Sequence, residues 1–156
     1  MSMSITVPKE YGYVLLTAAS TTVVASWIGF RVGIFRKATR IIKYPQRYAE
    51  QSQIAEASPE QKQRLYQYNC AQRAHGNFVE WHPSVVIAMM IGGLKFPVLS
   101  AGLGAAWTFS RFLYTVGYTN ASKPNGKGRQ IGLVFIPLQS VLFLVACYAG
   151  VQFVLQ

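Results

Sequence analysis

Two groups of polar residues in this sequence have the spacing of a binding site for a small charged molecule. Arg73, Asn77 and Glu80 follow one another at intervals of four and three residues. On an α-helix such intervals place side chains one above another on the same face. Arginine donates hydrogen bonds to carboxylates, glutamate accepts them from ammonium groups, and asparagine can do both. The spacing therefore predicts a polar helix face that suits a ligand carrying both kinds of charge.

The second group is Arg111, Tyr114 and Tyr118, which share a helix face by the same rule. Glu80 is the only acid in this part of the chain, and the basic residues expected around it are Arg36, Arg73, Arg111 and Arg129. One interpretation is a structural network in which Arg73 or Arg111 pairs with Glu80. The excess of positive charge instead favours an anionic ligand, because ionisable groups within a membrane region are costly to bury and are usually functional.

Long uncharged stretches predict the elements that position these residues. Residues 11–30 and 130–156 contain no charged side chain, and roughly 20 apolar residues suffice for a helix to span a bilayer. Buried helices of a soluble protein are the alternative, but such helices normally keep a charged outer face. A cleaved signal peptide would have a shorter apolar region. We predict a single all-α domain over 1–156, an integral membrane four-helix bundle with helices at about 7–35, 60–94, 98–118 and 130–155.

Local signals predict where these helices begin and break. Ser58 followed by Pro59 and by Gln61 at the third helical position is typical of a capped helix start. Tyr44-Pro45 predicts a break in the connection after the first helix. The segment 120–128 contains Gly, Pro and Lys and predicts a loop, and Pro137 is expected to bend the last helix.

The net charge of +10 could indicate nucleic-acid binding. Eight basic residues lie between Arg31 and Arg64, and basic loops between membrane helices are typical of the cytoplasmic side. We therefore expect no nucleic-acid partner, with the loops after the first and third helices in the cytoplasm. Cys70 and Cys147 show neither a CxxC motif nor a Cys/His cluster, so we expect neither a disulfide framework nor a metal site.

Several segments resemble one family of membrane proteins. Arg73-Ala-His-Gly-Asn77-Phe-Val-Glu80 resembles the RxxxNxxE signature of the MAPEG family, membrane-associated proteins in eicosanoid and glutathione metabolism. Residues 100–118 are similar to the third helix of that family, which also includes leukotriene C4 synthase. Residues 9–17 and 69–75 are similar to the microsomal glutathione S-transferase 3 branch. The resemblance extends in order and spacing over nearly the whole chain.

The resemblance implies a homotrimer that binds glutathione between subunits near their cytoplasmic ends. The matching glutathione-binding positions are Arg36, Arg73, His75, Asn77, Glu80, Tyr114 and Tyr118. The arginine that activates the thiol in the family matches Arg129, and Lys127 is the alternative because the preceding loop is longer here. Glutathione carries two carboxylates and one ammonium group, which suits several arginines and one glutamate. A neighbouring arginine also favours the thiolate over the thiol.

The function that follows from the resemblance is a glutathione transferase or peroxidase. The thiolate of glutathione would attack a lipophilic electrophile or a lipid hydroperoxide taken from the membrane lipids. His75 and Trp81 differ from the leukotriene-synthase branch and favour this general activity over leukotriene C4 synthesis. A non-enzymatic lipid-binding scaffold and a plain structural membrane protein are the alternatives. The expected location is the endoplasmic reticulum, with the mitochondrial outer membrane second.

Overall fold

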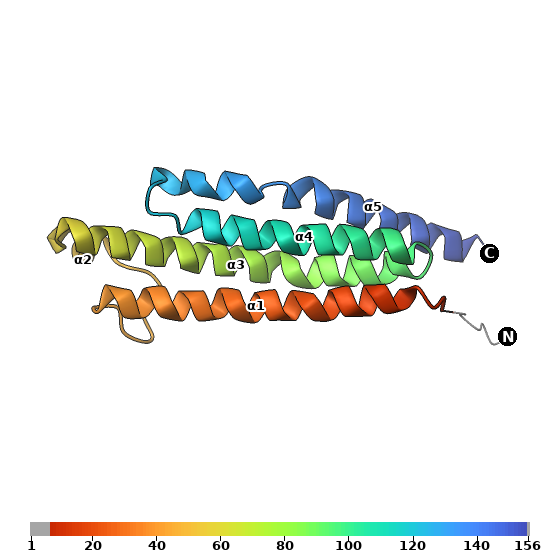
Figure 1. The fold of residues 1–156 in the computed structure, drawn as a ribbon, viewed down its shortest axis with the longest axis horizontal. Helices are drawn as coiled ribbons and strands as arrows, with labels where there is room; N and C mark the ends of the chain where they lie inside the picture. The colour runs from red at the N-terminus through yellow and green to blue at the C-terminus, as the bar shows by residue number, and fades with distance from the viewer. Residues whose placement is uncertain (1–6, 156) are drawn as a thin grey trace. The chain divides into compact units, whose positions relative to one another are not determined.

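Every regular element in the computed structural model, which describes residues 7–155, is a helix. In chain order these are α1 (Tyr11–Thr39), α2 (Gln51–Glu56), α3 (Pro59–Gly93), α4 (Pro97–Tyr118), the 3-10 helix η1 (Pro124–Gly132) and α5 (Phe135–Val154) (Figure 1). The helices form two compact units. Among the described residues, the first unit comprises 7–22, 81–109 and 134–155, and the second comprises 23–80 and 110–133. The predicted all-helical class is thus confirmed for this range.

Two of the helices are long and apolar enough to cross a membrane. These are α1 and α5, whose most apolar windows have mean hydropathies of 1.5 and 1.6. Only 17% and 28% of these windows are buried within the chain, whereas the core helix of a soluble protein is mostly buried. Large apolar side chains such as Leu16, Phe30 and Leu144 are exposed on them. The other two predicted spans, over α3 and α4, stay predictions.

The first helix begins and ends about one turn later than its sequence predicts. The prediction was 7–35, but Pro8 lies in a turn closed by the Tyr11 N–H on its carbonyl, and α1 starts at Tyr11. The helix continues through Arg36 and Lys37 and ends at Thr39, where Arg40 has a φ of 62°. Long basic side chains are good helix formers and are stabilised near a helix C-terminus, so their polarity did not end the helix.

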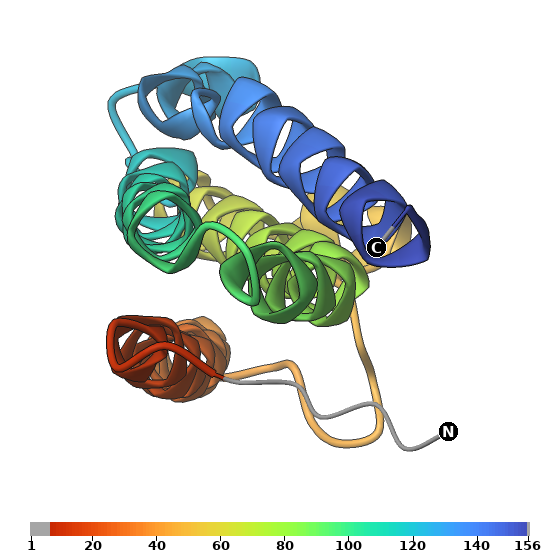
Figure 2. The ribbon, with the colours of Figure 1, turned by 90° about the vertical axis from the view of Figure 1, so that its right-hand side faces the viewer.

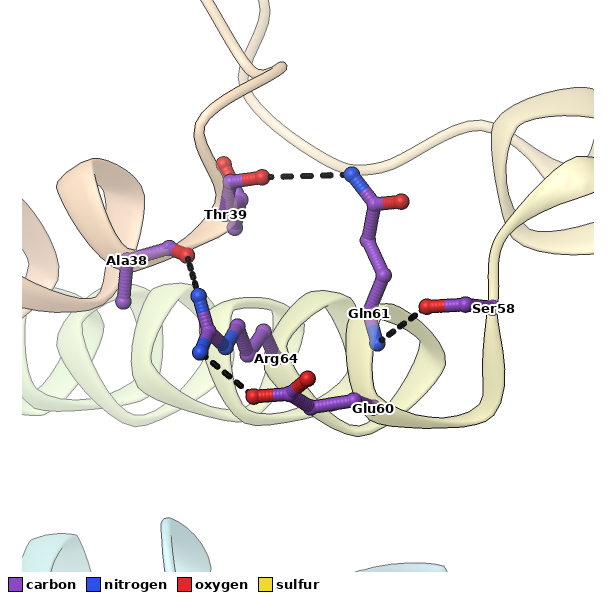
Figure 3. A network of polar contacts seen from close by, with 6 residues as sticks. All are labelled: Ala38, Thr39, Ser58, Glu60, Gln61 and Arg64. Carbon is purple, nitrogen blue, oxygen red and sulfur yellow. Dashed lines mark hydrogen bonds and ion pairs between the residues drawn. The ribbon is translucent and has the colours of Figure 1, made fainter.

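Side chains at the start of α3 cap the end of α1 (Figure 3). The start of α3 has a cap of its own, in which the Ser58 hydroxyl accepts a hydrogen bond from the Gln61 N–H at 3.3 Å. This bond confirms the cap predicted for α3. The Gln61 amide donates to the carbonyl of Thr39, at 3.5 Å. Arg64 donates to the carbonyl of Ala38 and pairs with Glu60. The last carbonyls of a helix have no partner within that helix. The bonds from Gln61 and Arg64 supply partners for two of them and join α1 to α3.

The connection between α1 and α2 is a long loop (Figure 2). Hydrogen bonds join it to α3. The Tyr68 hydroxyl donates to the carbonyl of Arg47 at 2.8 Å, and Asn69 accepts from the Ala49 N–H at 2.9 Å. Tyr68 is fully buried together with Leu65 and Ile42. The loop is therefore part of the packed second unit.

In the first unit, polar side chains from four helical segments meet among buried apolar ones. Thr21 of α1 hydrogen-bonds His82 of α3 at 2.7 Å, and the His82 ring stacks with that of Trp107 in α4. The Trp107 indole N–H donates to Gln139 of α5 at 3.3 Å. Met89 packs where Gly104 leaves space. In an apolar environment such paired polar groups hold helices together.

The last predicted helix is divided in two. A loop was expected over 120–128 and a single helix over 130–155, but η1 occupies residues 124–132 and α5 begins only at Phe135. η1 packs tightly on α4 through glycines, because a Cβ atom on Gly128 would overlap the backbone of Gly117 and one on Gly132 the backbone of Tyr114. Pro137 consequently lies in the first turn of α5, where its missing N–H costs no helical hydrogen bond.

Candidate functional site

A polar pocket of about 300 Å³ lies within the second unit. Three segments line it: the connection after α1, the middle of α3 and the last turns of α4. The lining residues are Arg47, Tyr48, Arg73, Gly76, Asn77, Glu80, Tyr114 and Tyr118. We call this site the arginine pocket. It contains five of the seven residues predicted to bind glutathione.

On α3 the predicted helix face is present. Arg73, Asn77 and Glu80 all line the arginine pocket, with Arg73 and Glu80 exposed and Asn77 half-buried. Gly76 lies between them, and a Cβ atom added there would lie 3.7 Å from Nη2 of Arg47. The two charged groups of this face are therefore accessible to a ligand.

On α4 the predicted face forms the inner wall of the arginine pocket. The rings of Tyr114 and Tyr118 are buried and contact each other edge to face, with centroids 5.4 Å apart. Arg111 is fully buried beside them, 4.7 Å from the Tyr114 ring centroid. Its Nη1 donates a hydrogen bond to Oδ1 of Asn77 at 2.9 Å. Arg111 thus orients Asn77, which leaves the Asn77 amide nitrogen as a donor.

Arg129 lies at the edge of this wall. Its guanidinium is 5.3 Å from the Tyr118 ring centroid, and its Nη1 is 3.4 Å from the carbonyl of Gly126. Lys127 is exposed and lines a different pocket, on the side of α4 where Leu113 and Val116 lie. Of the two candidates for thiol activation, Arg129 is the one beside an arginine-pocket residue.

Arg36 and His75 do not line the arginine pocket. Arg36 donates to the carbonyl of Gln46 at 2.8 Å and stacks on the rings of Tyr44 and Tyr68, so it holds the connection after α1. His75 is half-buried, and a Cβ atom at Gly29 of α1 would lie 3.9 Å from its Nε2. Their contact with glutathione stays a prediction.

Arg47 and Tyr48 line the arginine pocket although the sequence did not indicate them. Arg47 is one of eight basic residues between Arg31 and Arg64, which were interpreted only as cytoplasmic charge. The Tyr68 hydroxyl places Arg47 by donating a hydrogen bond to its backbone carbonyl, as described above. The loop has no helical or strand periodicity. The sequence therefore shows that a charged residue lies there, but it does not predict which element the side chain faces.

The charge of the arginine pocket favours an anion that also carries one cationic group. Its lining has two guanidinium groups and one carboxylate. Arg129 adds a further cation at its edge through Tyr118. Guanidinium groups bind carboxylates through paired hydrogen bonds. Among the described residues there is no group of three or more His, Cys, Asp or Glu that could hold a metal ion.

Comparison with known families shows to which protein family the chain belongs. The model of the MAPEG family matches residues 14–149, most of the sequence. The chain belongs to the MAPEG family. MAPEG proteins are membrane-associated, and they include glutathione-dependent transferases and peroxidases as well as non-catalytic members. The matched range contains the whole arginine pocket, Arg129 and most of each of the two helices that are apolar enough to span a membrane.

Proposed function

We propose that this MAPEG protein is a membrane-bound glutathione transferase or peroxidase of the microsomal glutathione S-transferase 3 type. The observation that carries the proposal is the charge pattern of the arginine pocket, two arginines and one glutamate within about 300 Å³. Glutathione has two carboxylates and one ammonium group. A ligand of that composition satisfies all three charged side chains at once.

Each group of glutathione has a partner in this proposal. Arg47 and Arg73 bind the carboxylates, and Glu80 binds the ammonium group. The Asn77 amide nitrogen and the hydroxyls of Tyr114 and Tyr118 are hydrogen-bond partners for the peptide groups. Arg36 and His75 would then act around this set, Arg36 by holding the loop that carries Arg47.

Arg129 is the proposed thiol-activating residue. A free cysteine thiol has a pKa of roughly 8.5, and a nearby guanidinium favours the thiolate. The thiol proton passes to solvent, and the sulfur attacks an electrophilic carbon to form a C–S bond. In a substitution the leaving group departs with the electron pair of the broken bond, and in an addition the C=C π bond breaks and the neighbouring carbon takes a proton from solvent. With a hydroperoxide the sulfur attacks the outer oxygen and the O–O bond breaks, which leaves a glutathione sulfenic acid and an alkoxide that takes a proton from solvent to become the alcohol. A second glutathione thiol then displaces water from the sulfenic acid and forms the disulfide. Bringing thiolate and acceptor together supplies much of the rate.

The same proposal includes a homotrimer of four-helix subunits in the endoplasmic reticulum membrane. The lipophilic acceptor would reach the site from the bilayer. The exposed apolar side chains of α1 and α5 support contact with lipid or with neighbouring subunits.

Glutathione titration of the detergent-purified protein tests the proposal. We expect saturable binding, an increase in ultraviolet thiolate absorbance, and conjugation to a general electrophile such as a chlorodinitrobenzene. Absence of binding at millimolar glutathione would contradict the enzyme. Binding without turnover would instead favour a non-catalytic family member.

Replacement of Arg129 tests the assignment of the thiol-activating residue. In Arg129→Ala we expect glutathione to bind while thiolate absorbance and turnover fall together, by roughly tenfold or more, because the cation that favours the thiolate is lost. Lys127→Ala is the matched control, since its side chain lines a different pocket. If the lysine variant loses the thiolate and the arginine variant keeps it, Lys127 is the activating residue.

A further inference from the structure

A second pocket, of about 460 Å³, lies on the other side of α4 from the arginine pocket. We call it the lysine pocket. Leu113 and Val116 of α4 and Ile131 of η1 supply its apolar wall, and Asn120, Lys123 and Lys127 its polar part. Helical spacing places Leu113 and Val116 on the face opposite Tyr114 and Tyr118. The two pockets therefore have separate linings and different chemistry.

The lysine pocket is shaped before any ligand binds. The backbones of α4 and η1 approach closely where Gly117 meets Gly128, both of which line it. Beyond α4, the Asn120 side chain accepts hydrogen bonds from Ser122, and the Lys123 N–H donates to the Asn120 carbonyl at 3.2 Å. These contacts hold the backbone that carries Lys123.

Tyr66 of α3 holds the next part of this loop. Its hydroxyl accepts a hydrogen bond from the Gly126 N–H at 2.6 Å and lies 3.4 Å from the carbonyl of Lys123. A tyrosine phenol has a pKa of about 10. The phenol is therefore neutral at physiological pH and can both accept and donate. The segment between the two lysines is fixed at both of its ends.

The lysine pocket has positive charge without a compensating acid. None of its lining residues is acidic. Neither ammonium group is in an ion pair with any residue of the part of the chain that the structure describes. Two lysines close to each other in the chain are a suitable site for a phosphate, which attracts several donors at once.

The polar and apolar parts are also ordered along α4. Leu113 and Val116 lie in its last two turns, whereas Asn120 and Lys123 follow its end at Tyr118. In a family of membrane-associated proteins, such an order matches a lipid, whose charged headgroup lies at the surface and whose chain lies deeper. Basic pockets beside membrane helices bind anionic headgroups on the cytoplasmic side.

We propose that the lysine pocket binds an anionic phospholipid. Lys123 and Lys127 contact the phosphate of the headgroup, and an acyl chain packs on Leu113, Val116 and Ile131. The site is separate from glutathione binding, and it would attach the loop between α4 and α5 to the membrane surface. The shared chemistry of the ligand is a phosphate, which free phosphate in the cytosol also offers.

Lipid retention in nanodiscs tests the proposal. The full-length protein is reconstituted in phosphatidylcholine containing a minor fraction of phosphatidylserine or phosphatidylinositol, extracted in mild detergent, and its bound lipids are measured by native mass spectrometry. We expect selective retention of the anionic lipids. In the double variant Lys123→Ala/Lys127→Ala we expect the affinity to fall roughly 25-fold, about fivefold for each lysine.

Matched variants separate this site from general surface charge and from free phosphate. Lys43→Ala/Lys62→Ala removes the same charge from two exposed lysines outside the pocket and should retain the lipid. Ile131→Asn should weaken lipid retention without affecting inorganic phosphate, and size-exclusion profiles check that each variant is folded. Equal loss in both lysine pairs would overturn the proposal. So would displacement by millimolar inorganic phosphate combined with no effect of Ile131→Asn, which would assign the pocket to free phosphate.

Discussion

At the scale of residues, the charged side chains in and beside the arginine pocket differ in their exposure. Arg73 and Glu80 are exposed on α3, whereas Arg111 is fully buried on α4 and donates to Asn77. A buried guanidinium cannot easily reach a ligand, but it can orient an amide that does. Accordingly, we interpret Arg111 as a positioning residue, and Arg73, Glu80 and Arg47 as the groups that contact the ligand.

Replacement of Glu80 tests the proposed ammonium contact. In Glu80→Gln we expect glutathione affinity to fall about tenfold, because a hydrogen bond between charged groups contributes roughly 1.5–3 kcal/mol. Calorimetric titration measures it, with Glu56→Gln in α2 as the control for loss of an exposed acid. Glutathione without its amino group should bind the wild type and the Glu80→Gln variant equally. A preference of the wild type for that analogue over glutathione would contradict the contact.

Replacement of Arg47 tests the residue that only the structure indicated. In Arg47→Ala we expect glutathione to bind several-fold to tenfold more weakly, because one carboxylate loses its guanidinium partner. The Tyr68 hydroxyl bonds the backbone of Arg47, so the loop should remain in place. Lys43→Ala, in the same loop, is the control. Unchanged binding in Arg47→Ala would remove Arg47 from the site.

At the scale of elements, the second unit depends on the close contact of α4 with η1. The contact places Arg129 against Tyr118 and the lysines on the other side of α4. It is possible only because the residues at the crossing have no side chain, since a Cβ atom on either Gly117 or Gly128 would overlap the other's backbone.

Replacement of Gly128 tests this crossing. In Gly128→Ala we expect a loss of about 1–3 kcal/mol in the free energy of unfolding, because the added methyl group overlaps backbone atoms that cannot move independently. Gly102→Ala in α4 is the matched control, since no atom lies within 4 Å of the added carbon, and alanine is the better helix former. Thermal unfolding in detergent compares the two. Equal stability would mean that η1 can move away from α4.

At the scale of the whole molecule, basic residues are distributed unevenly between the two units. Of the 15 Lys and Arg residues, only Lys9 and Lys95 belong to the first unit. Basic residues remain on the cytoplasmic side of membrane proteins. The second unit, which contains both pockets, is therefore the part that we expect to lie at the cytoplasmic surface, where glutathione is abundant.

Glycosylation tags test this orientation. We expect tags at the two termini to be modified in microsomes, and tags in the connection after α1 or in the loop after α4 to remain unmodified, because glycosylation occurs only on the lumenal side. A protease-protection assay on the same tagged proteins provides an independent readout. Modification of the tag after α1 would reverse the predicted orientation.

Local chemistry explains why most helices were predictable. The uncharged stretches predicted α1 and α5, and the Ser58 cap predicted the start of α3. The end of α1 was predicted one turn early, because basic residues are equally compatible with a loop and with a last helical turn. The short helix α2 was not predicted, because residues 51–56 show no repeated apolar residues at helical spacing. In the structure none of their side chains is buried.

The sequence by itself determined the helix faces of the site, and the tertiary structure determined their surroundings. Arg73, Asn77 and Glu80 share a face through the pitch of one helix, which depends only on residue spacing. The entry of Arg47 into the pocket depends on Tyr68, and the separation of Arg129 from Lys127 depends on the packing of η1 on α4. These contacts join segments without a common period, so only the folded chain decides them.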